Sequence, residues 1–497
     1  MKNRIKQYLL AASMCVGLTA CSDFFEPIPG VQFGLDETFA SKQRTEEYLN
    51  NVYSYVREVT DAIHPNTYGG IFTEASLDGA NRWNKTYAEW TNGSFNSASA
   101  QASEYFSKYY QAIAKASTFI QNVDKCTEAA ASTRGKWKSE ARALRAYYYF
   151  ELLRLYGPIP LIGEDPIPLD ASLEELIKER NSVDECVNFI ATELQSAIDS
   201  GDLLQRAGKA NLGRMDVATC MALKAKLYLY WASPLFNGNT DQASVKNKDG
   251  KQLFPQTEDH SKWTQTRDAY ERFMTFATGQ GYKLTEVYTN GKLDPYASCR
   301  AAGEFFTTTW EAVDELIFVK LRDLYDYTYW VCPKFTDFQD TDVTGGGGYY
   351  TTQETVDLFF TKDGLTIEED PGYDKFEGIP GANNFTSGRY YDPNNPSRLY
   401  FDADKSKVLK QWKDREPRFY VNITYSGSIW LNEGKYNEEM RTDFTNGANG
   451  TCGKSKASGD CPDSGYLIRR GAKASNNNGS KHFSPVLRLA DMYLGYA

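Results

Sequence analysis

The sequence predicts a mainly α-helical protein whose first half consists of irregular helical repeats and whose second half is rich in loops. Apolar residues recur every three or four positions in successive segments between residues 45 and 277, as they do along one face of a helix. From about residue 285 to 480 the composition changes to Gly, Asn, Asp, Thr and Tyr with short apolar runs. Such a composition is typical of loops.

The central predicted helix covers residues 135–157. Its two apolar stripes consist of Trp137, Ala141, Leu144, Tyr148, Leu152 and Leu155, and of Ala143, Ala146, Tyr147, Phe150 and Leu153. A helix that is apolar on two sides lies between other helices. Gly157-Pro158 ends it because proline cannot continue a helix. We therefore expect the other helices to pack around this one.

Helical spacing also occurs on both sides of this segment, at residues 45–59, 100–124, 187–198, 217–231 and 263–277. Ser182 and Glu185 form a capping box that starts the third of these helices. Alanine-rich contacts between consecutive helices suggest tetratricopeptide-like hairpins, although no strict repeat period is present.

The amino terminus resembles that of a bacterial lipoprotein. Residues 1–20 combine three basic residues with an apolar run that is too short to span a bilayer, which is typical of a secretion signal. The sequence Leu18-Thr19-Ala20-Cys21 resembles a lipobox, in which the cysteine is diacylated and becomes the first residue. We expect Cys21 to carry the lipid and residues 21–40 to form a tether. The alternative is an ordinary signal with an incidental cysteine.

Composition excludes one class of partner and favours another. The chain has 65 acidic and 55 basic residues and a net charge of −10, so it lacks the basic surface of a nucleic-acid-binding protein. Removal of residues 1–20, with three basic and no acidic side chains, brings the charge to −13, and only the lipid would hold such a chain on an anionic membrane. The 34 Tyr and 9 Trp residues suggest exposed aromatic side chains that contact carbohydrate or protein.

Cysteine and histidine patterns indicate neither a metal centre nor a catalytic triad. Of nine cysteines, Cys452 and Cys461 flank a loop and would be able to form a disulfide, whereas Cys126, Cys186 and Cys220 fall in helical patterns as small buried apolar residues. The three histidines are isolated, and CxxC and HExxH motifs are absent. We therefore expect no metal site and no cofactor.

One acidic cluster has the right residue type for calcium. Asp337, Asp340 and Asp342 lie close together in the sequence but lack the EF-hand spacing. We interpret them as a solvated acidic loop rather than as a calcium site.

Five segments follow one another in an order that matches a known family. They are Glu140–Leu161, Gly213–Tyr230, Thr352–Gly364, Asp414–Gly427 and Pro485–Ala497. Together they resemble the signature segments of the SusD/RagB family of outer-membrane lipoproteins, which capture nutrients in the Bacteroidetes. Arg415-Glu-Pro-Arg418 departs mildly from the usual Arg-Asp-Pro-Arg. Because the chain stops inside the closing signature helix, we expect the sequence to be a fragment or a truncated product.

The resemblance implies a fold, a function and a partner. It implies four tetratricopeptide-like hairpins within residues 41–284 and a loop-rich region over residues 285–497 that carries the ligand site. It also implies a non-enzymatic protein on the outer face of the outer membrane, which binds an oligosaccharide and delivers it to a TonB-dependent transporter of the SusC type. The alternatives are a lipid-anchored glycoside hydrolase and a peptide-binding member of the same family.

Two aromatic clusters are candidates for glycan binding. The first lies in the long loop before residue 100 and the second in Tyr-Asp-Tyr-Thr-Tyr-Trp; the candidates are Asn81, Trp83, Tyr87 and Trp90, and Tyr327, Tyr329 and Trp330. Sugar rings stack on aromatic rings, while amides and carboxylates bind the hydroxyl groups. The alternative is that these side chains only pack the loops together.

Overall fold

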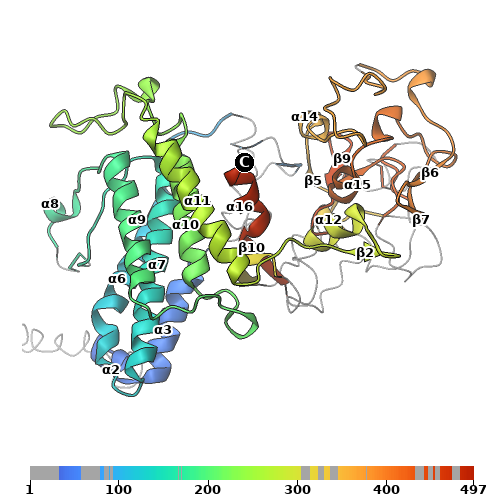
Figure 1. Ribbon diagram of the computed structural model, residues 1–497. Coiled ribbons are helices and arrows are strands. Elements are labelled where there is room, and N and C mark those ends of the chain that lie inside the picture. Colours follow the sequence, from blue (N-terminus) through green and yellow to red (C-terminus); the bar gives the residue numbers. More distant parts are fainter. Residues whose placement is uncertain are drawn as a thin grey trace, which may run out of the picture.

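The structure is a computed structural model that describes residues 33–56, 76, 79–82, 89, 93–165, 167–168, 171–303, 314–322, 330–335, 345–376, 378–430, 441–445, 452–453, 459–472 and 482–497. Long helices gather in one half of the molecule, and short helices and small sheets form the other (Figure 1). The predicted fold class, a mainly helical protein with helical hairpins and a loop-rich second half, is confirmed.

The helical half is a chain of antiparallel hairpins. Its long helices are α3 (Lys42–Ser54), α6 (Ala100–Asn122), α7 (Ala131–Tyr156), α9 (Val183–Asp199), α10 (Val217–Ala232) and α11 (Ser261–Gly279). From α6 onward each long helix packs against the next, and α3 packs against both α6 and α7. The predicted helices are thus present, although α3 ends at Ser54. The short helix α2 (Leu35–Ala40) lies inside the segment expected to be a tether and buries Phe39 completely.

Helix α7 is buried around most of its circumference, as its two apolar stripes predict. It also buries three charged residues, two of which contact neighbouring helices. Arg145, which is 0% exposed, donates from Nε to the Glu193 carboxylate of α9 at 2.8 Å and from Nη1 to Ser117 Oγ of α6 at 3.1 Å. Glu140 accepts a hydrogen bond from the Tyr53 hydroxyl of α3 at 2.9 Å. The polar groups of α7 therefore fix the positions of three neighbouring helices.

Helix α7 ends at Gly157-Pro158, as predicted. Gly157 has a φ of +68°, and a Cβ there would lie 3.0 Å from the Phe254 ring. A larger residue would be both strained and crowded at this turn. Helix α7 consequently stops where the chain reverses toward α9.

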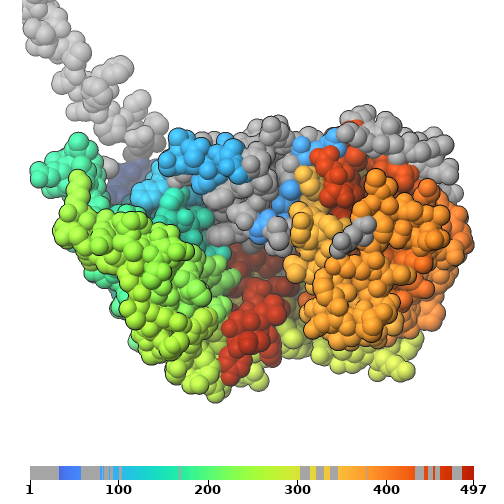
Figure 2. Space-filling model, turned by 90° about the horizontal axis from the view of Figure 1, so that it is seen from above, coloured from blue at the N-terminus to red at the C-terminus, as the bar shows by residue number. Residues whose placement is uncertain are grey.

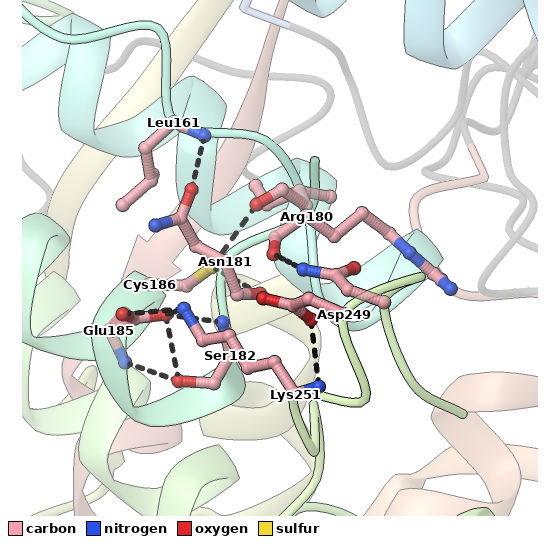
Figure 3. A network of polar contacts seen from close by, with 10 residues as sticks. Leu161, Arg180, Asn181, Ser182, Glu185, Cys186, Asp249 and Lys251 are labelled. Atoms are coloured by element: carbon pink, nitrogen blue, oxygen red, sulfur yellow. Dashed lines mark hydrogen bonds and ion pairs between the residues drawn. The ribbon is translucent and has the colours of Figure 1, made fainter. Parts of the chain in front are cut away.

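A polar network fastens the start of α9 to two loops (Figure 3). Ser182 Oγ accepts from the Glu185 backbone N–H at 3.3 Å, and the Ser182 N–H donates to the Glu185 carboxylate at 2.7 Å, which confirms the predicted capping box. Lys251 Nζ lies 2.7 Å from the same carboxylate, and Leu161 N–H donates to Asn181 Oδ1 at 3.0 Å. These contacts join the segment after α7 and the loop before α11 to one helix terminus.

The loop-rich half is built on small antiparallel sheets. A four-stranded sheet has the order β1 (Ala80–Asn81), β5 (Tyr349–Tyr350), β9 (Tyr466–Ile468) and β8 (Ile423–Tyr425). Two-stranded ribbons pair β2 (Tyr288–Thr289) with β3 (Lys292–Leu293), β4 (Leu316–Arg322) with β10 (His482–Arg488), and β6 (Arg389–Asp392) with β7 (Asn395–Asp402). The short helices are α8 (Leu173–Leu176) in the helical half, and α12 (Pro295–Gly303), α14 (Gln353–Asp357), α15 (Pro417–Asn422) and α16 (Leu489–Tyr496).

The two halves do not correspond to two separate cores. The helical core also contains residues of the second half, namely Ile317 and Phe318 of β4, Leu487 of β10, and Leu489 and Met492 of α16. Helix α16 consequently lies between the two halves, as Figures 1 and 2 show. A second core of aromatic and aliphatic side chains is centred on Trp412, Tyr420 and Tyr425.

One predicted boundary differs from the structure. The closing segment was expected to be helical from Pro485, yet Pro485 to Arg488 belong to β10, and the helix starts only at Leu489. Pro485 pairs with Val319 of β4, and a register shift follows it. Proline lacks a backbone N–H and is tolerated in a two-stranded ribbon at such an irregularity.

None of the seven described cysteines forms a disulfide, and all but the half-buried Cys299 are buried. Cys126, Cys186 and Cys220 are each 0% exposed, as predicted for small apolar residues. Cys452 and Cys461 are also buried, and no disulfide joins them. Among the described helices, none is both long and apolar enough to cross a membrane.

We expect Glu193→Gln to lower the free energy of unfolding by about 3–5 kcal/mol, because the buried Arg145 guanidinium loses its ionic partner. Urea unfolding measures this loss. The control is Glu164→Gln, since the Glu164 carboxylate lies 4.0 Å from the same guanidinium but its side chain is 69% exposed, and its loss should cost less than about 1 kcal/mol. Equal losses for the two variants would contradict the prediction.

Asp216 should make stability depend on pH. Its carboxylate is 0% exposed, and burial raises the pKa of Asp216 to about 6 from an ordinary 3.8, although Thr219 and Ala207 each donate a backbone N–H at 2.7 Å. The folded state therefore holds the Asp216 proton more tightly than the unfolded state does. The resulting contribution to the free energy of unfolding is fully present below the unfolded pKa and is lost as pH rises through the folded pKa.

The measurement is urea unfolding of the wild type and Asp216→Asn from about pH 4 to about pH 7. The stability of the wild type relative to the variant should fall by about 2–3 kcal/mol over this range. A difference that does not change with pH would show that Asp216 is not held at a raised pKa.

Candidate functional site

The structure describes two of the seven predicted glycan-binding residues. Asn81 lies in β1, and Trp330 is half-buried at the start of the segment 330–335. Trp83, Tyr87, Trp90, Tyr327 and Tyr329 lie outside the described residues, as does the predicted lipidation site, Cys21. The roles proposed for these residues therefore stay predictions.

Backbone pairing brings Asn81 and Trp330 into one region. Asn81 pairs with Tyr349 across β1 and β5, and the Arg82 N–H donates to the Gly348 carbonyl at 3.0 Å. Gly347 in turn donates its N–H to the Cys332 carbonyl at 2.9 Å. We call this meeting of residues 79–82, 330–335 and 345–350 the junction.

The junction also includes residues 459–463. Arg82 Nη1 lies 2.9 Å from both the Cys461 carbonyl oxygen and Asp463 Oδ1, and Lys334 Nζ lies 2.6 Å from Asp460 Oδ2. Gly347, with a φ of +56°, comes so close to this segment that a Cβ would lie 3.0 Å from the Asp460 carbonyl oxygen. Figure 2 shows blue, orange and red segments meeting here between the two halves.

Beside the junction, a hollow of about 610 Å³ opens on the loop-rich half. It is lined by Gln353, Asp357, Tyr373, Lys375, Phe376, Gly378, Pro380, Leu409, Gln411, Trp412, Ser426, Phe444, Thr445, Ser464, Gly465 and Tyr466. The two regions are joined through β9, because Tyr350 of β5 pairs with Leu467 directly after the lining residue Tyr466. A volume of this size is within the usual range for small-molecule sites.

Hydrogen bonds hold three of the rings in the hollow. Trp412 Nε1 donates to the Tyr466 hydroxyl at 3.0 Å, which donates to Gln353 Oε1 at 2.8 Å, and burial raises the pKa of Tyr466 to about 12. Tyr373 accepts from Arg415 Nη1 at 2.7 Å and donates to the Gln411 carbonyl at 2.9 Å. These rings are therefore fixed before any ligand arrives.

The other rings and polar groups of the hollow are more accessible. Phe376 and Phe444 are half-buried, and Ser464 and Lys375 are exposed. Asp357 supplies the one carboxylate among the described lining residues, and Gln353 Nε2 donates to it at 2.7 Å. The hollow thus offers flat apolar faces beside amide, hydroxyl and carboxylate groups.

Sequence reasoning missed this hollow. Gln353, Asp357 and Ser426 fall in two of the signature segments, but the rest of the lining comes from segments between residues 373 and 466 that the sequence analysis did not single out. Trp412 and Tyr466 were visible only as two aromatics among many, since their contact depends on how β8, β9 and the neighbouring loops pack. A signal for the site exists only after folding.

No metal centre is found where the structure can be described. Those residues contain no group of three or more His, Cys, Asp or Glu side chains placed to hold a metal ion. Asp337, Asp340 and Asp342 lie outside them.

Two family profiles match the chain. Residues 315–497 match the SusD family, and residues 32–229 match a profile described as "Starch-binding associating with outer membrane". The chain belongs to the SusD/RagB family. The description of the second profile names binding rather than catalysis, as expected for a family of non-catalytic binding proteins.

Individual relatives agree with this family assignment. A SusD-like protein of Bacteroides ovatus is 27% identical over 175 residues, which are 34% of this SusD-family chain and 30% of the relative's length. Among solved structures, BT4246 has a TM-score of 0.71 at 24% identity and covers 92% of this chain and 78% of its own. A SusD-like carbohydrate binding protein from Bacteroides fragilis has a TM-score of 0.61 at 18% identity, with 92% and 74% coverage. These likenesses show that the fold is shared.

Proposed function

We propose that this SusD-family chain binds a glycan on its loop-rich half and does not cleave it. The observation that carries the proposal is the hollow of about 610 Å³, in which aromatic rings lie beside amide and hydroxyl groups. Sugars have apolar C–H faces that stack on rings and hydroxyl groups that need hydrogen-bonding partners. The descriptions of the starch-binding profile and of the carbohydrate-binding relative support this ligand class.

The carboxylates of the hollow favour binding over hydrolysis. A glycoside hydrolase of the common type needs a pair of carboxyl groups on the two sides of the scissile bond. Among the described residues of the lining, Asp357 is the one carboxylic acid, and it is engaged by Gln353. Among the residues that the structure describes, the hydrolase alternative therefore has no second carboxyl group at this site.

The junction is proposed as a second contact surface for the same glycan. Asn81 and Trp330 come together there although about 250 residues separate them in the sequence. We propose that five further residues complete this surface, because each lies within nine positions of Asn81 or Trp330 in the sequence: Trp83, Tyr87, Trp90, Tyr327 and Tyr329. An oligosaccharide that reaches from the hollow to the junction would contact both.

The location and the partner are proposed from the amino terminus and the family. The lipobox at Cys21 supports a lipid anchor, and the name of the second profile supports association with the outer membrane. The family resemblance supports a TonB-dependent transporter of the SusC type as the partner that accepts the glycan.

The rings of the hollow are tested by Phe376→Ala and Phe444→Ala. Each variant removes about 60 Å² of apolar contact with a sugar, which is worth about 1.5 kcal/mol and should weaken glycan binding about tenfold in calorimetry. Phe360→Ala is the control, because Phe360 is 39% exposed in the same half of the molecule but does not line the hollow. Melting temperatures should change little in all three variants.

Four results would change the assignment. Equal affinity of Phe376→Ala and the control would move the site away from the hollow, and binding of peptides but not glycans would favour the peptide-binding alternative. Release of reducing ends from polysaccharides would indicate a hydrolase. Calorimetry and melting of Trp83→Ala, Trp90→Ala and Trp330→Ala test the junction. A loss of stability without a loss of glycan affinity would mean that these rings only pack loops.

Anchoring is tested by Cys21→Ala. The variant lacks the sulfur that would be acylated, so we expect it to be released into the soluble periplasmic fraction, whereas the wild type sediments with outer membranes. Cys126→Ala is the control, because Cys126 is a buried cysteine of the helical core and its loss should leave fractionation unchanged. A Cys21→Ala protein that still sediments with outer membranes would contradict the lipid anchor.

A further inference from the structure

Three arginines with similar burial differ in how their charge is satisfied. Arg145 forms an ion pair with the Glu193 carboxylate. Arg415, 2% exposed, donates to the Tyr373 hydroxyl at 2.7 Å and to the carbonyls of Val356 and Phe359 at 2.7 and 2.6 Å. Arg469 is 7% exposed and has no comparable set of partners.

The side chain of Arg469 has neither a hydrogen bond nor an ion pair with any residue that the structure describes, and its buried Nε has no acceptor. Its guanidinium carbon lies 5.6 Å from the centre of the Trp430 ring. The nearby hydroxyl of Tyr425, a residue that is 0% exposed, likewise lacks a hydrogen-bond partner within the described part of the chain. Two buried donors are thus unsatisfied in one place.

The surroundings of Arg469 add positive rather than negative charge. Burial, reinforced by the nearby Arg300, lowers the pKa of Arg469, while the neighbouring hydroxyls of Tyr296 and Tyr425 act in the opposite direction. A buried charge without a partner is strongly unfavourable. Such a group is expected to receive an anion or to be satisfied by ordered water.

Arg469 is also close to the junction. The Trp430 ring beneath its guanidinium contacts Phe335 at 6.4 Å between ring centres, and Phe335 belongs to the junction segment that starts with Trp330. Arg469 directly follows β9, the strand that links the junction to the hollow. The unsatisfied donors therefore lie next to the proposed glycan surface.

We propose that Arg469 binds the anionic group of an acidic saccharide, either a carboxylate or a sulfate ester, with the Tyr425 hydroxyl as a second donor. This inference rests on the proposed glycan-binding function and narrows its ligand class. The chain as a whole carries a net charge of −10, so it repels free anions. An anion borne on a sugar that also contacts the junction overcomes this repulsion through its additional contacts.

The test compares ligands that differ in charge. Calorimetry would measure binding of an oligogalacturonate, a chondroitin sulfate oligosaccharide, a neutral malto-oligosaccharide and inorganic sulfate to the wild type, Arg469→Met, Arg469→Lys and Tyr425→Phe. The control is Arg418→Met, because Arg418 is half exposed and already paired with Glu416. We expect at least one acidic oligosaccharide to bind the wild type more tightly than the neutral one.

Arg469→Met should weaken binding of that acidic oligosaccharide about 10- to 100-fold and leave the neutral one unchanged. Arg469→Lys should retain part of the preference because it keeps the charge but loses the planar fork. Tyr425→Phe should reduce the preference for the acidic oligosaccharide, whereas Arg418→Met should leave it unchanged.

Other results would overturn the proposal. If neutral glycans bind and acidic glycans bind no more tightly, the inference is wrong and the proposed function still stands. If no glycan binds, both are wrong. Inorganic sulfate binding as tightly as the acidic oligosaccharide would show a simple anion site instead of a saccharide site.

Melting without ligand gives an independent readout. Arg469→Met loses no protein hydrogen bond, so its melting temperature should equal or exceed that of the wild type. Arg415→Met should melt lower, because it leaves buried carbonyls without donors. An Arg469→Met protein destabilised as much as Arg415→Met would mean that Arg469 already has protein partners in solution, and the proposal would fail.

Discussion

The buried guanidinium of Arg145 is the constraint on which the helical scaffold depends. A charge that is 0% exposed must have its partners in place, so α9 has to present Glu193 and α6 has to present Ser117 at the same point on α7. Apolar packing alone would allow neighbouring helices to slide or rotate. The polar contacts of α7 exclude these alternatives and give the hairpins one relative position.

The loop-rich half depends on that scaffold because part of it belongs to the same core. The β4–β10 ribbon and α16 insert Phe318, Leu487 and Met492 among the helices, so both ends of the second half are attached to the first. Between these attachments, the short strands of the four-stranded sheet gather loops from residues 80 to 468. Loops held on a rigid scaffold are the usual place for binding sites, and both the hollow and the junction lie on this sheet.

The buried polar groups are of two kinds. Some stabilise the fold, and others have donors that are available to a ligand. Glu193, Asp216 and Arg415 have hydrogen-bond partners within the protein, and they lie where helices or loops must be joined. Arg469 and Tyr425 retain unsatisfied donors and lie next to the proposed glycan surface. A protein tolerates such exceptions where function requires them.

The sequence by itself determined the helices, their caps and the family. The stripes of α7, the stop at Gly157 and the Ser182–Glu185 capping box depend on residues a few positions apart, and such local patterns survive folding unchanged. The sequence did not show that Pro485 lies in a strand, because the partner strand β4 is more than 150 residues away in the chain. The hollow, the meeting of Asn81 with Trp330, and the isolation of Arg469 were likewise decided only by tertiary structure. Each depends on contacts between segments distant in the chain, which no local pattern encodes.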